Sequence, residues 1–117
     1  MIEFGTLLRQ FRNERGESLG TLSKKLGVGV PFLSLLENGK KIIPIEYGDK
    51  LTEVLGLNLD DSIKLKNSID YTNRRISIDL DKMSDAQQEV SLTFARTINT
   101  ASDKKLEEIL KVLESDD

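Results

Sequence analysis

The residue types of this chain exclude most catalytic chemistry. It contains no cysteine and no histidine, which excludes disulfides, zinc–thiolate sites, cysteine nucleophiles and imidazole acid/base catalysis. Its paired carboxylates are adjacent in sequence, so on a helix they point apart rather than converge on one substrate or ion. These pairs are Asp60-Asp61, Glu107-Glu108 and Asp116-Asp117. The sequence therefore predicts no catalytic site, no metal site and no cofactor, and a protein that is not an enzyme.

The chemistry that remains is phosphate recognition by basic side chains, which are concentrated near the N-terminus. Residues 1–44 hold seven Lys or Arg and four Glu, a balance of +3, whereas the net charge of the chain is −3. The rest of the chain must therefore carry −6. A basic segment beside an acidic one is expected of a protein that meets nucleic acid with one part only. The alternative is an ordinary solvated surface, on which such a balance is also common.

The basic side chains must be positioned by the stretch from Leu19 to Gly39, which has the pattern of a helix-turn-helix. Ser18 is a good N-cap for the first of two short helices. Gly27 lies just past the end of that helix, where a left-handed backbone costs little. Pro31 falls in the first turn of the second helix, where its missing N–H removes no hydrogen bond. The two helices are therefore predicted to be separated by a tight turn.

Three further helices are predicted to support this motif, over about residues 3–15, 45–55 and 59–71. In each of them apolar residues recur at helical spacing and form one stripe. The expected buried residues are Phe4, Leu7, Leu8, Phe11, Tyr47, Leu51, Val54, Leu55, Leu59, Ile63 and Ile69. The five helices together make a predicted head domain of residues 1–72.

Residues 73–117 have a different pattern and are predicted to form a C-terminal domain. Ile76, Ile78 and Leu80 alternate with polar residues, which indicates a short strand, and two amphipathic helices follow. The predicted fold class is therefore all-α, with a five-helix head and a small element of one strand and two helices. Two copies of the lone strand could pair about a two-fold axis, so these three residues are predicted to mediate dimerisation. The alternative is an extended linker packed on its own head.

No segment predicts export or membrane insertion. The N-terminus lacks the charged start and the apolar run of a signal peptide, and no run of about 18 apolar residues occurs in the chain. We therefore expect a cytoplasmic protein that does not bind membranes.

These residues resemble the helix-turn-helix regulators of the Cro/phage-repressor (XRE) family. The similarity covers about residues 4–57. It runs through Leu8-Arg9, Arg12, Gly16, Leu22, Leu26-Gly27-Val28, Leu33-Ser34, Leu36 to Lys40, Pro44 and Leu55-Gly56. The resemblance implies a five-helix head and a sequence-specific regulator of bacterial or phage type that acts as a dimeric repressor on double-stranded DNA.

The resemblance also implies roles for four charged residues. Arg12 and Glu37 match the ion pair that joins the first and third helices in the family, where it would fix the angle of the third helix. The alternative is a solvated pair of little consequence, since surface pairs contribute about 0–1 kcal/mol. Lys40 and Lys41 match positions that lie along the sugar-phosphate backbone, where contacts orient a protein without reading sequence.

By the same resemblance, DNA is contacted by the start and the exposed face of the third helix and by the connector after it. The predicted DNA-binding residues are Gly29, Val30, Pro31, Ser34, Leu35, Asn38, Lys40 and Lys41. Relatives often carry Gln, Arg, Thr or Asn on this face, which hydrogen-bond to base edges, whereas Val, Pro and Leu contact a thymine methyl group at most. Many relatives also have a phosphate-binding Gln where this chain has Leu19.

Three explanations of the apolar face remain open at the level of sequence. It could read methyl groups and DNA shape and depend on basic side chains for affinity. It could be covered by the acidic tail or by a second subunit. It could also have exchanged DNA for a protein partner, since exposed apolar clusters commonly mark interaction surfaces. The alternative to a repressor is therefore an antitoxin or adaptor that binds and neutralises a protein partner.

Overall fold

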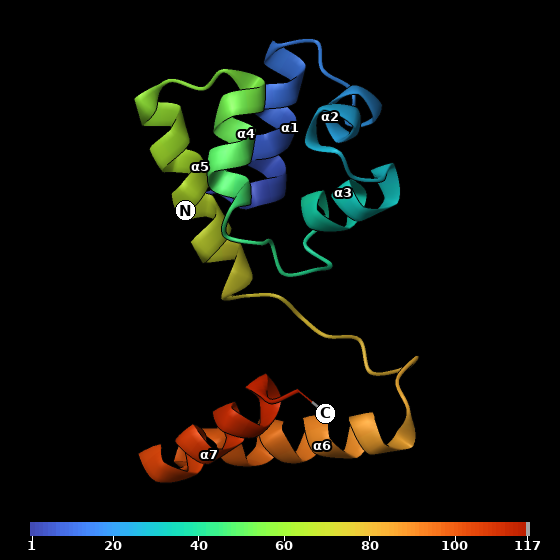
Figure 1. Ribbon diagram of the computed structural model, residues 1–117, viewed down its shortest axis with the longest axis vertical. Coiled ribbons are helices and arrows are strands. Elements are labelled where there is room, and N and C mark those ends of the chain that lie inside the picture. The colour runs from blue at the N-terminus through green and yellow to red at the C-terminus, as the bar shows by residue number, and fades with distance from the viewer. Residues whose placement is uncertain (117) are drawn as a thin grey trace. The chain divides into compact units, whose positions relative to one another are not determined.

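The computed structural model describes residues 1–116, which form two compact units. The first unit, here called the head, is Met1–Ile78, and the second, here called the tail, begins at Asp79. The described part of the chain is all-α, with seven α-helices, one 3-10 turn and no β-strand (Figure 1). None of the helices in these residues combines the length and the apolar composition needed to cross a membrane.

Five helices make up the head. They are α1 (Phe4–Glu14), α2 (Leu19–Leu26), α3 (Val30–Glu37), α4 (Tyr47–Leu55) and α5 (Leu59–Asn73). Helix α1 packs against both α3 and α5, while α4 packs against α2 and α5. Helices α2 and α3 pack against each other and form the helix-turn-helix (Figure 1). The five helices that the sequence predicts are therefore confirmed, although α4 begins two residues later than expected.

The helix ends of the helix-turn-helix follow the predicted local signals. The Ser18 hydroxyl accepts the backbone N–H of Thr21, and the Thr21 hydroxyl accepts the backbone N–H of Ser18, which makes a reciprocal capping box at the start of α2. Gly27 ends α2 with φ 72°, a left-handed conformation that glycine adopts without steric cost. These two signals coincide with the start and the end of α2.

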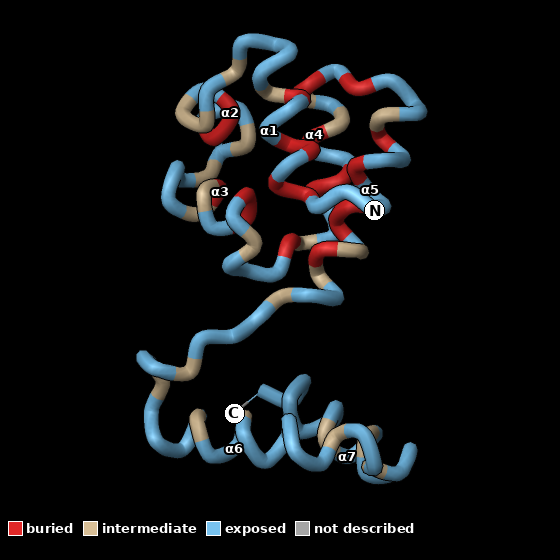
Figure 2. The backbone as a smooth tube through the Cα atoms, turned by 180° about the vertical axis from the view of Figure 1, so that it is seen from behind, coloured by how far each residue is buried: buried red, intermediate tan, exposed pale blue. Residues whose placement is uncertain are grey.

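The head is built around one hydrophobic core (Figure 2). Its fully buried large side chains come from every helix of the head and from the connector after α3. They are Phe4, Leu8, Phe11, Leu22, Leu33, Leu36, Ile43, Leu51 and Leu65. Burial of one such side chain contributes about 1.5–3 kcal/mol, which is the main source of stability for short helices.

The predicted buried stripe of α5 is partly wrong. Leu59 and Ile63 are exposed, and Leu65 is buried together with Ile69. The true stripe includes Ser62 and Ser68, whose hydroxyls form hydrogen bonds inside the head, at 2.8 Å to the Thr52 hydroxyl and at 2.6 Å to the Leu65 carbonyl oxygen. Small hydroxylated residues pack closely once their hydrogen bonds are satisfied, but they look polar in a sequence.

The tail is a helical hairpin without a buried core. It consists of α6 (Asp85–Thr97), the 3-10 turn η1 (Ile98–Thr100) and α7 (Asp103–Glu114). Ser84 starts α6 through a capping box with Gln87, and the Ser102 hydroxyl accepts the backbone N–H of Lys105 at the start of α7. Within the described residues of the tail, no side chain is buried (Figure 2).

The predicted strand is absent from the described residues. Residues 76–80 adopt neither helix nor strand, because a strand needs the backbone groups of a neighbouring strand and no described residue of the chain supplies one. Ile76 and Leu80 are half-buried, and Ile78 is exposed. Helix α5 continues to Asn73 and the head to Ile78, so the separation of the two units falls later than residue 72.

Candidate nucleic-acid interface

The exposed face of α3 brings together the residues that the sequence predicts to enter the major groove. Val30, Ser34 and Asn38 form one row at helical spacing, and Pro31 and Leu35 form a second row beside it. Val30 is 42% and Leu35 44% exposed, and Pro31 and Asn38 are also exposed. We call these five residues the recognition face.

The opposite side of α3 is held by the core. Leu33 and Leu36 are fully buried, and the half-buried Phe32 ring lies 6.1 Å from the Tyr47 ring of α4. Gly29 precedes the helix as its N-cap and supplies no side-chain hydrogen bond there. Helix α3 therefore buries one apolar side in the core and leaves a second apolar side exposed.

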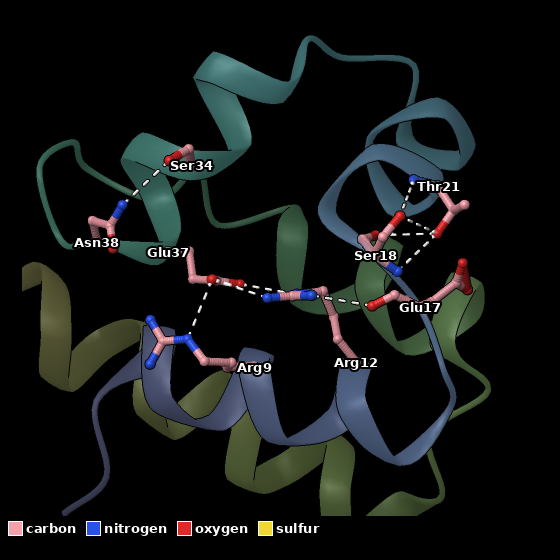
Figure 3. A network of polar contacts seen from close by, with 8 residues as sticks. All are labelled: Arg9, Arg12, Glu17, Ser18, Thr21, Ser34, Glu37 and Asn38. Carbon is pink, nitrogen blue, oxygen red and sulfur yellow. Dashed lines mark hydrogen bonds and ion pairs between the residues drawn. The ribbon is translucent and has the colours of Figure 1, made fainter.

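A network of ion pairs joins α3 to α1 (Figure 3). The Arg12 guanidinium donates two hydrogen bonds to the Glu37 carboxylate, at 3.0 and 3.1 Å, and a third to the Glu17 carbonyl oxygen at 3.1 Å. Arg9 approaches the same carboxylate at 3.5 Å. Glu17 also pairs with Lys25, whose hydrogen bond lowers the pKa of the Glu17 carboxyl. Arg12 thus connects α1, α3 and the segment before α2.

Burial decides how much the Arg12–Glu37 pair matters. The side chains are only 11% and 6% exposed, which differs from the solvated pair considered as the alternative. Removal of one partner from a buried pair leaves an uncompensated charge and costs about 3–5 kcal/mol. The bidentate geometry also fixes the direction of both side chains. The pair therefore holds α3 at one angle to α1.

Gly5 permits the close approach of α1 and α3. A Cβ atom at this position would lie 1.8 Å from the Glu37 carbonyl oxygen, far closer than van der Waals contact. Gly5 was not recognised from the sequence. Its only sequence signal is a glycine inside an amphipathic helix, where it costs about 1 kcal/mol relative to alanine and therefore needs a packing reason.

The connector after α3 is held by the last residue of α5. The Asn73 side chain accepts the Ile43 backbone N–H and donates to the Ile43 carbonyl oxygen, both at 2.9 Å. This connector carries Lys40 and Lys41, which are exposed, and the Lys41 ammonium lies 5.6 Å from the centre of the Phe32 ring. Asn73 was not recognised from sequence, because its partner is 30 residues away. The two lysines are thus placed beside the recognition face.

The family of this part of the chain follows from comparison with known proteins. Residues 8–62 match the family described as Helix-turn-helix. These residues form a helix-turn-helix domain of the XRE (Cro/phage-repressor) type. The match extends from α1 into α5 and includes the recognition face, Arg12, Glu37 and both connector lysines. The resemblance stated from the sequence is therefore confirmed, and the head carries a DNA-binding domain.

Two curated relatives of the helix-turn-helix domain are named as regulators. The HTH-type transcriptional regulators SinR of Bacillus licheniformis and of Bacillus subtilis (strain 168) are each 31% identical over 68 residues, which is 57% of this chain. The matched region spans 61% of each relative. No solved structure matches the chain.

The residues predicted to mediate dimerisation fall on both sides of the boundary between the two units. Ile76 and Ile78 belong to the head, in the segment after α5, and Leu80 belongs to the tail. The apolar surface of the tail lies instead on the hairpin, where Val90, Phe94 and further residues line a groove of about 350 Å³. The other apolar residues of this hairpin groove are Ile98, Ala101 and Ile109.

Proposed function

We propose that this protein is a dimeric transcriptional repressor that binds double-stranded DNA sequence-specifically in the cytoplasm. The observation that carries the proposal is the recognition face, which is exposed on a helix that the buried Arg12–Glu37 pair holds rigidly. In helix-turn-helix proteins the second helix of the motif lies in the major groove. Lys40 and Lys41 would then contact the phosphates beside that groove.

Charge reversal at the connector tests this docking. The variant Lys40→Glu with Lys41→Glu should bind duplexes from its own promoter region at least about tenfold more weakly at 0.15 M salt. The slope of log affinity against log salt should fall by about two, because two phosphate contacts are lost. Fluorescence anisotropy across a salt series measures both quantities.

The matched control is Lys64→Glu with Lys66→Glu. It makes the same change of charge at exposed positions in the middle of α5, which packs against α1 and α4 (Figures 1 and 2). It should keep most of the affinity. Equal losses in the two variants would show a nonspecific charge effect, and no loss in either would contradict this docking.

Dimerisation is the second part of the proposal, and the hairpin supports it. A unit that buries none of its described side chains lacks the main source of helix stability. Its exposed apolar residues, among them Val90, Phe94 and Leu110, would become buried if two copies of the groove packed together. Sedimentation equilibrium of the full chain should give twice the monomer mass at micromolar concentration. A monomer throughout the micromolar range would contradict this part.

A protein-binding adaptor or antitoxin is the alternative function, and the composition of the recognition face favours it. Val30, Pro31 and Leu35 offer no hydrogen-bonding side chain to a base, whereas such residues are common in protein interfaces. The distinguishing result is the duplex preference of the full chain. Equal and weak binding to promoter and scrambled duplexes would favour the adaptor. A strong preference for one duplex would favour the repressor.

A further inference from the structure

We infer that the recognition face reads the C5-methyl groups of thymine, so that the preferred duplex carries thymines at the major-groove positions it contacts. This inference rests on the proposed DNA-binding function and specifies the bases that the same surface selects. It follows from three properties of the face, which are its hydrogen-bonding capacity, its apolar geometry and its rigidity.

The recognition face has no hydrogen-bonding side chain at the N-terminal end of α3. The N-terminal residues of a recognition helix approach the base edges first, and here these are Val30 and Pro31. The two polar side chains are Ser34 and Asn38, and the Asn38 amide donates to the Ser34 hydroxyl at 3.2 Å (Figure 3). A bidentate contact of Asn38 with adenine would have to compete with this hydrogen bond. Asn38 also lies at the C-terminal end of α3.

The apolar geometry fits methyl groups in the major groove. The C5-methyl group of thymine is the apolar feature that base pairs present there. Val30 and Pro31 start the two rows of the recognition face, and Leu35 follows Pro31 after one turn, about 5–6 Å away. Adjacent base pairs are separated by about 3.4 Å, so the two ends of the face reach methyl groups on neighbouring or next-neighbouring pairs.

Rigidity makes such weak contacts selective. A methyl contact loses much of its energy when the gap widens by 0.5–1 Å, so it discriminates only if the helix is held in place. Helix α3 is held by the buried Glu37 carboxylate and by the Gly5 contact. Burial of one methyl group contributes about 0.8 kcal/mol, which raises the affinity for the duplex about fourfold.

Uracil substitution tests the inference, because it removes the methyl group and keeps every hydrogen-bonding group of thymine. The preferred duplex is first selected with the full chain from a library with a randomised core. Each core thymine is then replaced by deoxyuridine, and affinity is measured by anisotropy. We expect about three- to fivefold weaker binding per contacted thymine, and about tenfold or more for two. Thymines in the flanks serve as the control and should tolerate the change.

A methyl group on another base provides the reverse test. Replacement of a sensitive T·A pair by C·G should weaken binding, and 5-methylcytosine at that position restores a methyl group at the same place in the groove. We expect it to recover about fourfold of the lost affinity. No recovery at any sensitive position would show that the thymine preference comes from other features of the base.

A protein variant identifies the side chain that reads the methyl group. Leu35→Ala should lower affinity for the thymine duplex toward that of the uracil duplex, so the thymine-to-uracil ratio approaches one at the contacted position. The matched control is Ile63→Ala on α5, since Ile63 is 49% exposed and Leu35 44%. The control should leave the ratio unchanged.

The outcomes separate this inference from the function on which it rests. A selected duplex that binds far better than scrambled DNA, but tolerates uracil at every core position, would overturn methyl reading and keep the repressor. Equal binding to all duplexes would overturn both. In that case the apolar recognition face would belong to a protein partner instead.

Discussion

The head and the tail start their helices with the same local signals, but only the head buries a core. Ser18 and Ser84 each form a capping box, so the helices after them begin in the same way. The head then buries fourteen hydrophobic side chains, whereas the described residues of the tail bury none. Caps contribute about 1 kcal/mol each, far less than a core. The comparison shows that helix signals and tertiary stability are separate properties of a sequence.

The difference also has a functional meaning. If α3 reads DNA as proposed, it must keep its position against the phosphate backbone, and a core and a buried ion pair hold it in the head. The tail keeps its apolar residues exposed, which the proposed dimerisation requires of the free chain. Substitutions in the two regions should therefore affect different measurements.

The tightest contact of the head should give the largest effect. Gly5→Ala places a Cβ atom 1.8 Å from the Glu37 carbonyl oxygen, so α1 and α3 must separate, at a cost of about 3 kcal/mol or more in unfolding free energy. The control is Gly20→Ala in α2, where the nearest atom, the Ser18 hydroxyl oxygen, is 3.6 Å away. It should be neutral or stabilise by up to about 1 kcal/mol. Urea unfolding followed by circular dichroism measures both, and equal changes would show that the head is less tightly packed.

The buried ion pair should give the next effect. Arg12→Ala leaves the Glu37 carboxylate buried with only Arg9 beside it, and we expect a loss of about 3 kcal/mol. Arg74→Ala is the matched control, since Arg74 pairs with Asp70 at a similar 3.1 Å but with side chains 73% and 68% exposed. The Arg74→Ala variant should lose less than about 0.5 kcal/mol of unfolding free energy. Similar losses in the two variants would contradict the importance of burial.

The hydrogen bonds of Asn73 should give a smaller effect. Asn73→Ala leaves the backbone N–H and carbonyl oxygen of Ile43 without this partner, and we expect about 1–2 kcal/mol of destabilisation. It should also weaken DNA binding, because the connector with its lysines is loosened. Asn67→Ala, at an exposed position on the same helix, should change neither quantity. Unchanged stability of the Asn73 variant would mean that water replaces the side chain.

A tail substitution should leave the head unchanged. Phe94→Ser removes an exposed aromatic ring of the hairpin groove, so the core of the head loses nothing. We expect the unfolding free energy of the head to change by less than about 0.5 kcal/mol. The dissociation constant of the proposed dimer, measured by sedimentation equilibrium, should rise at least about tenfold. A large loss of head stability at concentrations where the chain is monomeric would show that the two units are not independent.

Local signals allowed much of the head to be predicted. Ser18, Gly27 and Pro31 defined the helix-turn-helix, because capping, left-handed turns and missing N–H groups act within a single helical turn. The stripe from Phe4 to Phe11 defined the buried side of α1. The same reasoning was wrong for the strand at residues 76–80, because alternation indicates an extended segment but supplies no partner.

What the sequence determined by itself is therefore the order and the ends of the helices, the helix-turn-helix motif and the apolar character of the recognition face. Only the tertiary structure decided that the Arg12–Glu37 pair is buried, that α5 buries serines in place of Leu59, and that Gly5 and Asn73 position α3 and its connector. The physical reason is range. Caps and turns depend on neighbours in sequence, whereas burial depends on which surfaces meet when distant segments pack together.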